Sequence, residues 1–345
     1  MKSMNIQNFS LGLLASSIIL YFLYIGQSII IPLVIAIIIW YIIISLTEAF
    51  KKIKIGSIKI PHWLALLFSL ASFAIIAWIF VDFVNKNVQE VIIAAPSYQA
   101  KFQSIFTNLQ ASLNLEEQIS LQQILEWVNL STIATTAAGI VTTIAGFASI
   151  IFIYVLFLLL EYHTFNEKIF KLIPDKKKRD DSTALINKIS KDINTYIKIK
   201  TFVSFLTALL CFIVLSIMGI QFAGFWAVLI FVLNFIPNVG SLIAVILPGL
   251  FSLVQYDLPH AFLLLLILTL IQMTIGNILE PRLMGKSLNL SPLVIIISLV
   301  IWGSLWGIVG MFLCVPIMVI TNIILAKFPA TKPIAILLSS RGDII

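Results

Sequence analysis

Long apolar runs limit what this chain can fold into. Residues 222–256 and 293–326 are each longer than the roughly 20 residues that an α-helix needs to cross a bilayer. The chain is 60% hydrophobic and only 11% charged, whereas about a quarter of a soluble domain is charged. We therefore expect an all-α, polytopic integral membrane protein with about eight membrane segments.

The charged residues and cysteines exclude several kinds of partner and cofactor. The net charge is +7, but the lysines flank apolar spans, where they set orientation in the bilayer. No basic patch interleaved with aromatic residues is present, so we expect no nucleic-acid partner. Cys211 and Cys314 lie inside apolar runs and are interpreted as small core residues. We expect no metal site and no cofactor.

Catalytic motifs are also absent. The HExxH, GxSxG and P-loop patterns do not occur. The three histidines, His62, His163 and His260, are far apart, and each lies at the end of an apolar span. We therefore expect no catalytic residues and no enzymatic activity.

The N-terminal region, residues 1–84, is predicted to hold three spans. These are residues 9–25, 28–47 and 62–84. The first lacks a small-residue cleavage site and is interpreted as a retained helix. Only two residues separate it from the second span, which predicts a tight helical hairpin. The lysines of residues 48–61 place that short loop on the cytoplasmic side.

Residues 85–132 are predicted to form extracytoplasmic amphipathic helices. Apolar residues from Tyr98 to Leu109 recur at helical spacing, and Ser120 with Gln123 forms a possible capping box for a second helix. One interpretation lays these helices on lipid or on neighbouring helices. The other makes them a subunit contact in a homo-oligomer.

The rest of the chain divides into four predicted regions. Residues 133–160 form a fourth span rich in small residues. Residues 161–200 form a basic cytoplasmic loop with an amphipathic helix, in which Lys176–Lys178 and Arg179 either bind anionic lipid or only set topology. Residues 201–326 are the predicted transport core, and residues 327–345 are a cytoplasmic tail.

Two runs of this core are interrupted by proline, glycine and polar residues. Residues 222–256 contain Asn234, Pro237, Asn238 and Gly240, and residues 293–326 contain Gly303, Ser304, Gly307, Gly310 and Pro316. Such residues free backbone groups that need protein or water partners inside a bilayer.

The positive-inside rule separates two topologies for the interrupted runs. If both runs cross the membrane, Arg282 and Lys286 lie outside. If both are re-entrant hairpins, these two residues lie inside with Lys327 and Lys332. The rule favours two broken or re-entrant hairpins arranged as an inverted repeat, a pattern that points to the substrate site of a transporter.

A short polar segment, residues 276–292, separates two very apolar runs. Asn277 and Glu280 are three apart and would share a helix face, and Pro281 is expected to end that helix. In one interpretation Glu280 only pairs with Arg282 or Lys286 at the surface. In the other it takes part in transport, because a carboxylate at a membrane boundary is costly unless it is used.

Two motifs resemble those of a known family. Residues 235–248, FIPNVGSLIAVILP, and residues 280–292, EPRLMGKSLNLSP, are similar to signatures of the autoinducer-2 exporter family, the PerM-like permeases. Asn238 departs from the aromatic residue that members often carry there. The resemblance implies a multi-pass inner-membrane permease. Some members resemble exporters of the quorum-sensing furanone, and others have been assigned cation–proton antiport.

Three functions are compatible with these patterns. The first is export of a small polar solute by alternating access. The second is cation–proton antiport, which needs a titratable intramembrane carboxylate, for which Asp82, Glu161 and Glu280 are the candidates. The third is a membrane scaffold without transport. The expected partners are membrane lipids and a small polar solute or cation, and both termini are expected to be cytoplasmic.

The expected substrate path is made of residues near the interruptions and the polar segment. They are Asn234, Pro237, Asn238, Gly240, Gln272, Asn277, Glu280, Pro281, Gly285 and Ser304.

Overall fold

The computed structural model describes residues 6–55, 58–113, 132, 135, 136, 139, 142, 146–285, 289–340 and 342. It divides into two compact units. Unit 1 consists of Met1–Ser45, Phe147–Asn194 and Lys286–Ile345, and unit 2 of Leu46–Gly146 and Thr195–Gly285. Each unit is described by itself.

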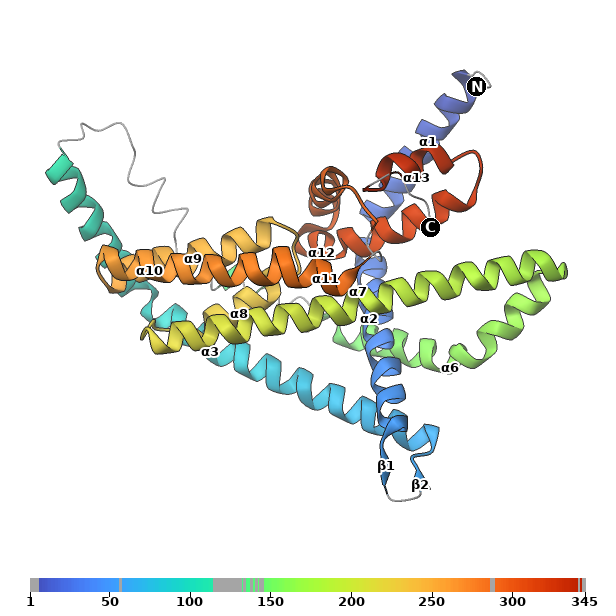
Figure 1. Cartoon of the computed structure of the whole chain (residues 1–345), viewed down its shortest axis with the longest axis horizontal. Coiled ribbons are helices and arrows are strands. Elements are labelled where there is room, and N and C mark those ends of the chain that lie inside the picture. The colour runs from blue at the N-terminus through green and yellow to red at the C-terminus, as the bar shows by residue number, and fades with distance from the viewer. Residues whose placement is uncertain are drawn as a thin grey trace. The chain divides into compact units, whose positions relative to one another are not determined.

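The described residues are almost entirely helical, as the apolar runs predict (Figure 1). The α-helices are α1 (Ile6–Ile25), α2 (Gln27–Lys52), α3 (His62–Leu113), α6 (Ala148–Leu172), α7 (Lys176–Ile217), α8 (Ala223–Leu233), α9 (Val239–Gln255), α10 (Leu258–Gln272), α11 (Glu280–Met284), α12 (Pro292–Lys327) and α13 (Lys332–Leu338). A π-helix, η1 (Met273–Leu279), joins α10 to α11. Strands β1 (Lys54–Ile55) and β2 (Ile58–Lys59) form a small antiparallel hairpin between α2 and α3.

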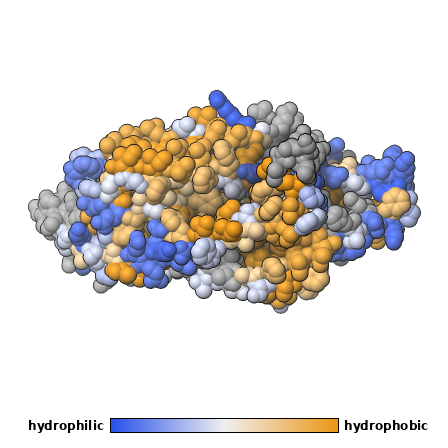
Figure 2. All heavy atoms as spheres, turned by 90° about the horizontal axis from the view of Figure 1, so that it is seen from below, coloured by the Kyte–Doolittle hydropathy of each residue, from blue (hydrophilic) through white to orange (hydrophobic). Residues whose placement is uncertain are grey.

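Five described helical segments are long and apolar enough to cross a membrane: Gln27–Lys52, His62–Lys101, Lys176–Ile217, Leu258–Met284 and Pro292–Lys327. Large apolar side chains such as Trp78 and Phe152 are mostly exposed, and hydrophobic atoms cover broad areas of the face in Figure 2. A soluble protein rarely exposes apolar patches of this extent. The molecule is therefore an all-α, polytopic membrane protein whose outer side chains contact lipid.

The predicted hairpin between the first two spans is wrong. The N–H of Gly26 donates to the carbonyl of Phe22, and the N–H of Ile30 donates to the carbonyl of Gly26. These bonds have α-helical spacing, and Gly26 has no positive φ. Helix α2 therefore continues from α1 without reversing direction (Figure 1).

Helix α3 does not end at Val84 as expected but continues to Leu113. Val84, Val88, Val91 and Tyr98 are buried in the core of unit 2, and their spacing of three to seven residues keeps them on one helix face. The polar residues between them lie on the other face, so the helix continues where the apolar run stops. The side chains of Phe102 and Phe106 and the expected helix near Ser120 lie outside the described residues.

The predicted fourth span is described mainly from residue 146 onward. Helix α6 is described from Ala148 and continues beyond Leu160 to Leu172, whereas most of residues 133–145 lie outside the described part. Ile151 and Val155 are buried and one turn apart.

The first interrupted run is a helical hairpin in unit 2. Helices α8 and α9 pack against each other, and the chain reverses between Asn234 and Asn238. Trp226 of α8 packs on Phe251 of α9 with ring centroids 5.4 Å apart. Both side chains belong to the hydrophobic core of unit 2.

The second interrupted run is a helical hairpin in unit 1. Helix α12 is broken at Gly307, whose φ is 60°. The hydroxyl of Ser298 donates to the carbonyl of Cys314 at 3.3 Å, although sixteen residues of straight helix would span about 24 Å. The two arms of α12 are therefore antiparallel. Both interrupted runs are confirmed as hairpins.

The expectation that Pro281 ends its helix is wrong. Helices α10, η1 and α11 follow one another without a break, and the helix ends at Gly285, whose φ is 54°. Proline in a helix clashes with the carbonyl four residues earlier. Here the N–H of Glu280 bonds the carbonyl of Ile275, five residues back. The wider π-turn before Pro281 thus accommodates the proline without ending the helix.

At its other end α10 begins with a side-chain cap. The carboxylate of Asp257 accepts a hydrogen bond from the backbone N–H of His260 at 3.3 Å, which satisfies one free donor of the first turn. The hydrogen bond from the His260 side chain holds the pKa of the Asp257 carboxyl below its usual value.

Candidate functional site

Three polar side chains form a stripe on the apolar part of α7. Lys200, Ser204 and Thr207 follow one another at intervals of four and three residues, which places them on one face. All three are buried. Thr207 donates to the carbonyl of Val203 at 2.8 Å. The other two find their partners in more distant segments of unit 2.

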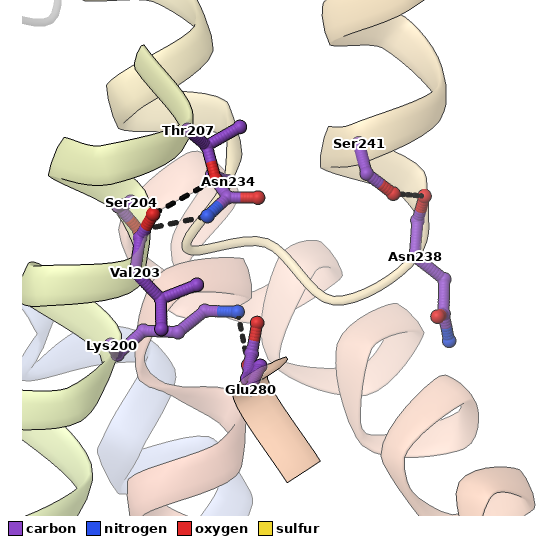
Figure 3. A network of polar contacts seen from close by, with 8 residues as sticks. All are labelled: Lys200, Val203, Ser204, Thr207, Asn234, Asn238, Ser241 and Glu280. Atoms are coloured by element: carbon purple, nitrogen blue, oxygen red, sulfur yellow. Dashed lines mark hydrogen bonds and ion pairs between the residues drawn. The ribbon is translucent and has the colours of Figure 1, made fainter. Parts of the chain in front are cut away.

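Lys200 forms an ion pair with Glu280, at the start of α11 (Figure 3). The lysine Nζ lies 2.6 Å from the carboxylate Oε1, and the two side chains are 7% and 17% exposed. Removing two charges from water is costly, and the mutual attraction offsets that cost only when the geometry is good. The pair joins α7 to the helix that follows η1, and it carries no net charge.

This pair contradicts the interpretation in which Glu280 only pairs with a sequence neighbour at the surface. In that interpretation its partners were Arg282 or Lys286, but Arg282 is exposed and Lys286 lies outside the described residues. Lys200 was expected to belong to the basic loop. The sequence does show that Lys200, Ser204 and Thr207 have the spacing of one helix face. The predicted boundary between the basic loop and the transport core, however, lies after Lys200 and separates it from the other two.

Asn234, at the end of α8, joins the same group of polar residues. Its amide Nδ2 donates to the hydroxyl of Ser204 at 3.0 Å, and the residue is 6% exposed. A buried amide is stable only with hydrogen-bond partners. Ser204 therefore holds the tip of the α8–α9 hairpin against α7, one helical turn from Lys200 (Figure 3).

Asn238 and Gly240 shape the hairpin tip on its other side. Asn238 has a φ of 57° and is exposed, and its side chain lies apart from the Lys200–Glu280 pair (Figure 3). Its carbonyl accepts a hydrogen bond from Ser241 at 2.9 Å. A Cβ on Gly240 would lie 1.7 Å from the carbonyl oxygen of Leu233. Pro237 lies in the non-helical turn between α8 and α9.

The π-helix separates two residues that were expected to share a face. Asn277 is exposed, whereas Glu280 is largely buried against Lys200. A π-turn holds more residues than an α-turn, so a spacing of three no longer aligns side chains. At the start of the π-helix Gln272 is buried.

The remaining expected site residues have other surroundings. Pro281 is exposed in the first turn of α11, and Gly285 follows its last turn. Ser304 belongs to unit 1, is exposed, and donates its hydroxyl to the carbonyl of Val300 at 2.8 Å. Of the expected residues, the structure joins Asn234 and Glu280 to one polar stripe through Ser204 and Lys200 respectively.

We call Lys200, Ser204, Thr207, Asn234 and Glu280 the polar cluster of unit 2. It contains an ammonium, a carboxylate, an amide and two hydroxyls. Such a set of donors and acceptors is suited to binding a polar molecule.

Comparisons with known proteins show which family the chain resembles. The family model of the AI-2E family transporter matches residues 13–330. A putative transport protein of Haemophilus influenzae is 30% identical over 350 residues, covering 99% of each chain. AI-2 transport protein TqsA of Escherichia coli is 31% identical, covering 91% of this chain and 90% of its own. A putative transport protein of Borreliella burgdorferi is 40% identical over about half of each chain, 56% and 55%.

The family model covers nearly the whole chain, including both helical hairpins and the polar cluster. The chain therefore belongs to the AI-2E family of transporters.

Proposed function

We propose that this transporter exports a small uncharged polar solute across the cytoplasmic membrane, through a path that includes the polar cluster. The observation that carries the proposal is the buried, neutral Lys200–Glu280 pair beside the tip of a broken helical hairpin. Polar groups inside a membrane bundle are costly, and they mark substrate pathways. Because the pair has no net charge, a solute does not need to bring a compensating charge.

The chemistry of the cluster favours a molecule with several hydroxyl or carbonyl groups. Glu280 accepts hydrogen bonds, Lys200 donates them, and the amide of Asn234 does both. A polyhydroxylated solute can exchange these bonds one for one as it enters. Autoinducer-2 is the first solute to test, because the similar Escherichia coli protein is called an AI-2 transport protein.

The hairpins suggest how access could alternate between the two sides. In our proposal α8–α9 and α12 are re-entrant, and movement of the α8–α9 tip exposes the cluster first inside and then outside. Pro237, Asn238 and Gly240 form that tip. The helix that carries Glu280 also contains Asn277 and Pro281, and Gly285 follows its last turn. The protein is a homo-oligomer with both termini in the cytoplasm.

Ion pairing makes antiport the weaker alternative. Each of its three candidate carboxylates is paired with a lysine: Asp82 with Lys86, Glu161 with Lys168, and Glu280 with Lys200. A transported cation would first have to displace an ammonium group. Asp82 and Glu161 are also about half exposed, unlike the enclosed acids of proton pathways.

Flux measurements test the proposal directly. The purified protein is placed in liposomes, and movement of autoinducer-2 is compared with that in protein-free liposomes. A pH-sensitive dye follows proton movement under a sodium gradient in the same preparation. We expect autoinducer-2 flux without sodium-driven proton movement. Sodium-driven proton movement without solute flux would overturn the proposal in favour of antiport.

A further inference from the structure

Gln272 has an unsatisfied hydrogen-bond donor in the interior of unit 2. The residue is 8% exposed, and its side-chain Nε2 is buried without a hydrogen-bond partner among the described residues. Buried polar atoms are nearly always hydrogen-bonded, and an exception calls for an explanation. The requirement is stronger in a membrane helix, where lipid offers no partner.

Gln272 lies level with the tip of the α8–α9 hairpin. A Cβ on Gly249 of α9 would lie 2.2 Å from the Leu265 side chain of α10, so these positions face each other. Gln272 lies about two turns after Leu265 on α10, and Ser241 lies about two turns before Gly249 on α9. Gln272 and Ser241 are therefore at the same height. Ser241 belongs to the first turn after the hairpin tip.

Gln272 also lies on the buried face of its own helix. Leu264 and Leu268 precede it at intervals of four residues, and all three are buried. The π-helix begins at the next residue and ends directly before Glu280. π-turns inside α-helices occur frequently at functional sites. The unsatisfied donor and the ion pair are thus at the two ends of one π-helix.

We propose that Gln272 is a specificity-determining residue of the solute path, whose amide donates a hydrogen bond to a carbonyl or hydroxyl oxygen of the bound solute. The inference rests on the proposed function and names the residue that selects neutral solutes with an acceptor oxygen. Binding such an oxygen satisfies the donor. A solute without an acceptor leaves the donor unsatisfied and is rejected.

The test substitutes Gln272→Met, which keeps the length of the side chain and removes the donor. The purified variant is unfolded thermally in detergent with increasing autoinducer-2, with D-ribose as a second neutral solute and glutamate as a charged one. Removing an unpaired buried polar group does not destabilise a protein, so we expect an unfolding temperature equal to or above that of the wild type. We expect the apparent Kd for the neutral solutes to rise about fivefold, the equivalent of one lost hydrogen bond.

Trp226→Phe is the matched control. The indole Nε1 of Trp226 is also buried without a partner among the described residues, but Trp226 belongs to α8 and its ring packs against the rings of Phe225 and Phe251. This variant should bind the neutral solutes with the wild-type Kd. Gln272→Glu, which replaces the donor with an acceptor, should weaken binding as Gln272→Met does.

The outcomes separate the inference from the proposed function. If the wild type binds a neutral solute and Gln272→Met binds it equally well, the inference is wrong and the proposed function stands. A lower unfolding temperature for Gln272→Met with an unchanged Kd would show a purely structural role. If the wild type binds only glutamate, or binds and moves no neutral solute, both are overturned.

Discussion

The two helical hairpins reverse the chain with the same backbone device but place different side chains at their tips. In each, a glycine of the second arm lies against a carbonyl of the first. A Cβ would lie 1.7 Å from the Leu233 oxygen at Gly240 and 1.8 Å from the Trp302 oxygen at Gly310. A residue with positive φ begins each second arm, Asn238 in α8–α9 and Gly307 in α12.

The side chains around the two tips differ in chemistry. The α8–α9 tip has the buried Asn234, bonded to Ser204 of the polar stripe on α7. The α12 tip has Trp302 and Trp306, whose ring centroids are 4.9 Å apart with the planes tilted by 52°. The Trp306 indole donates to the Leu23 carbonyl of α1 at 3.0 Å. The close approach of a glycine to a carbonyl is common to both tips, whereas the side chains beside it are polar in α8–α9 and aromatic in α12.

The largest expected effect comes from the shared glycines. Gly240→Ala and Gly310→Ala each place a methyl group inside the van der Waals radius of a backbone carbonyl, which cannot move as a side chain can. We expect each to destabilise the protein by more than about 5 kcal/mol, the exceptional range for a single substitution, seen as loss of monodisperse protein in detergent. Gly276→Ala is the control, because its Cβ meets nothing within 4 Å. A folded Gly240→Ala would refute the shared device.

The next effect concerns the Lys200–Glu280 ion pair, which joins α7 to α11 one helical turn from Ser204, the partner of the α8–α9 tip. Lys200→Met or Glu280→Met alone leaves a buried charge unpaired and should cost about 3–5 kcal/mol. The double variant removes both charges, so its unfolding temperature should return close to that of the wild type. If the pair serves transport, the double variant should still lack autoinducer-2 flux. Normal flux in the double variant would make the pair purely structural.

A smaller effect should distinguish the two tips directly. Asn234→Leu removes the amide that bonds Ser204 and should lower autoinducer-2 flux about tenfold, the equivalent of about 1.4 kcal/mol. Ser304→Ala removes only a bond to the Val300 carbonyl of its own helix, so flux should be unchanged. Equal losses in the two variants would mean that both tips contribute to the path.

The smallest expected effect comes from a substitution that makes the α8–α9 tip resemble the α12 tip, where a glycine has the positive φ. Asn238 has a φ of 57° and a ψ of −55°, a conformation that glycine adopts without strain. Asn238→Gly should raise stability by about 1 kcal/mol, measured by thermal unfolding, and keep transport, because the Asn238 side chain lies away from the cluster. Asn238→Ala should not be stabilising. A loss of flux in Asn238→Gly would give the side chain a direct role.

The sequence predicted the helical class because a bilayer imposes a simple length rule on apolar runs. It located the interruptions at Pro237 and Gly307 for a similar reason, since proline and glycine disturb helices locally. The local rules gave the wrong result where the neighbouring turns could adapt. The chain continues through Gly26 and through Pro281, in the second case because the π-turn before Pro281 widens.

The family and the two motif segments were also evident from the sequence, as was the polar character of Asn234 and Glu280. Only the tertiary structure decided their partners. Lys200 and Glu280 are 80 residues apart, and Ser204 and Asn234 are 30 apart. Helical periodicity relates neighbours within one or two turns, so it places Lys200, Ser204 and Thr207 on one face. It does not say which distant helix packs on that face, because that depends on how the whole bundle buries its side chains.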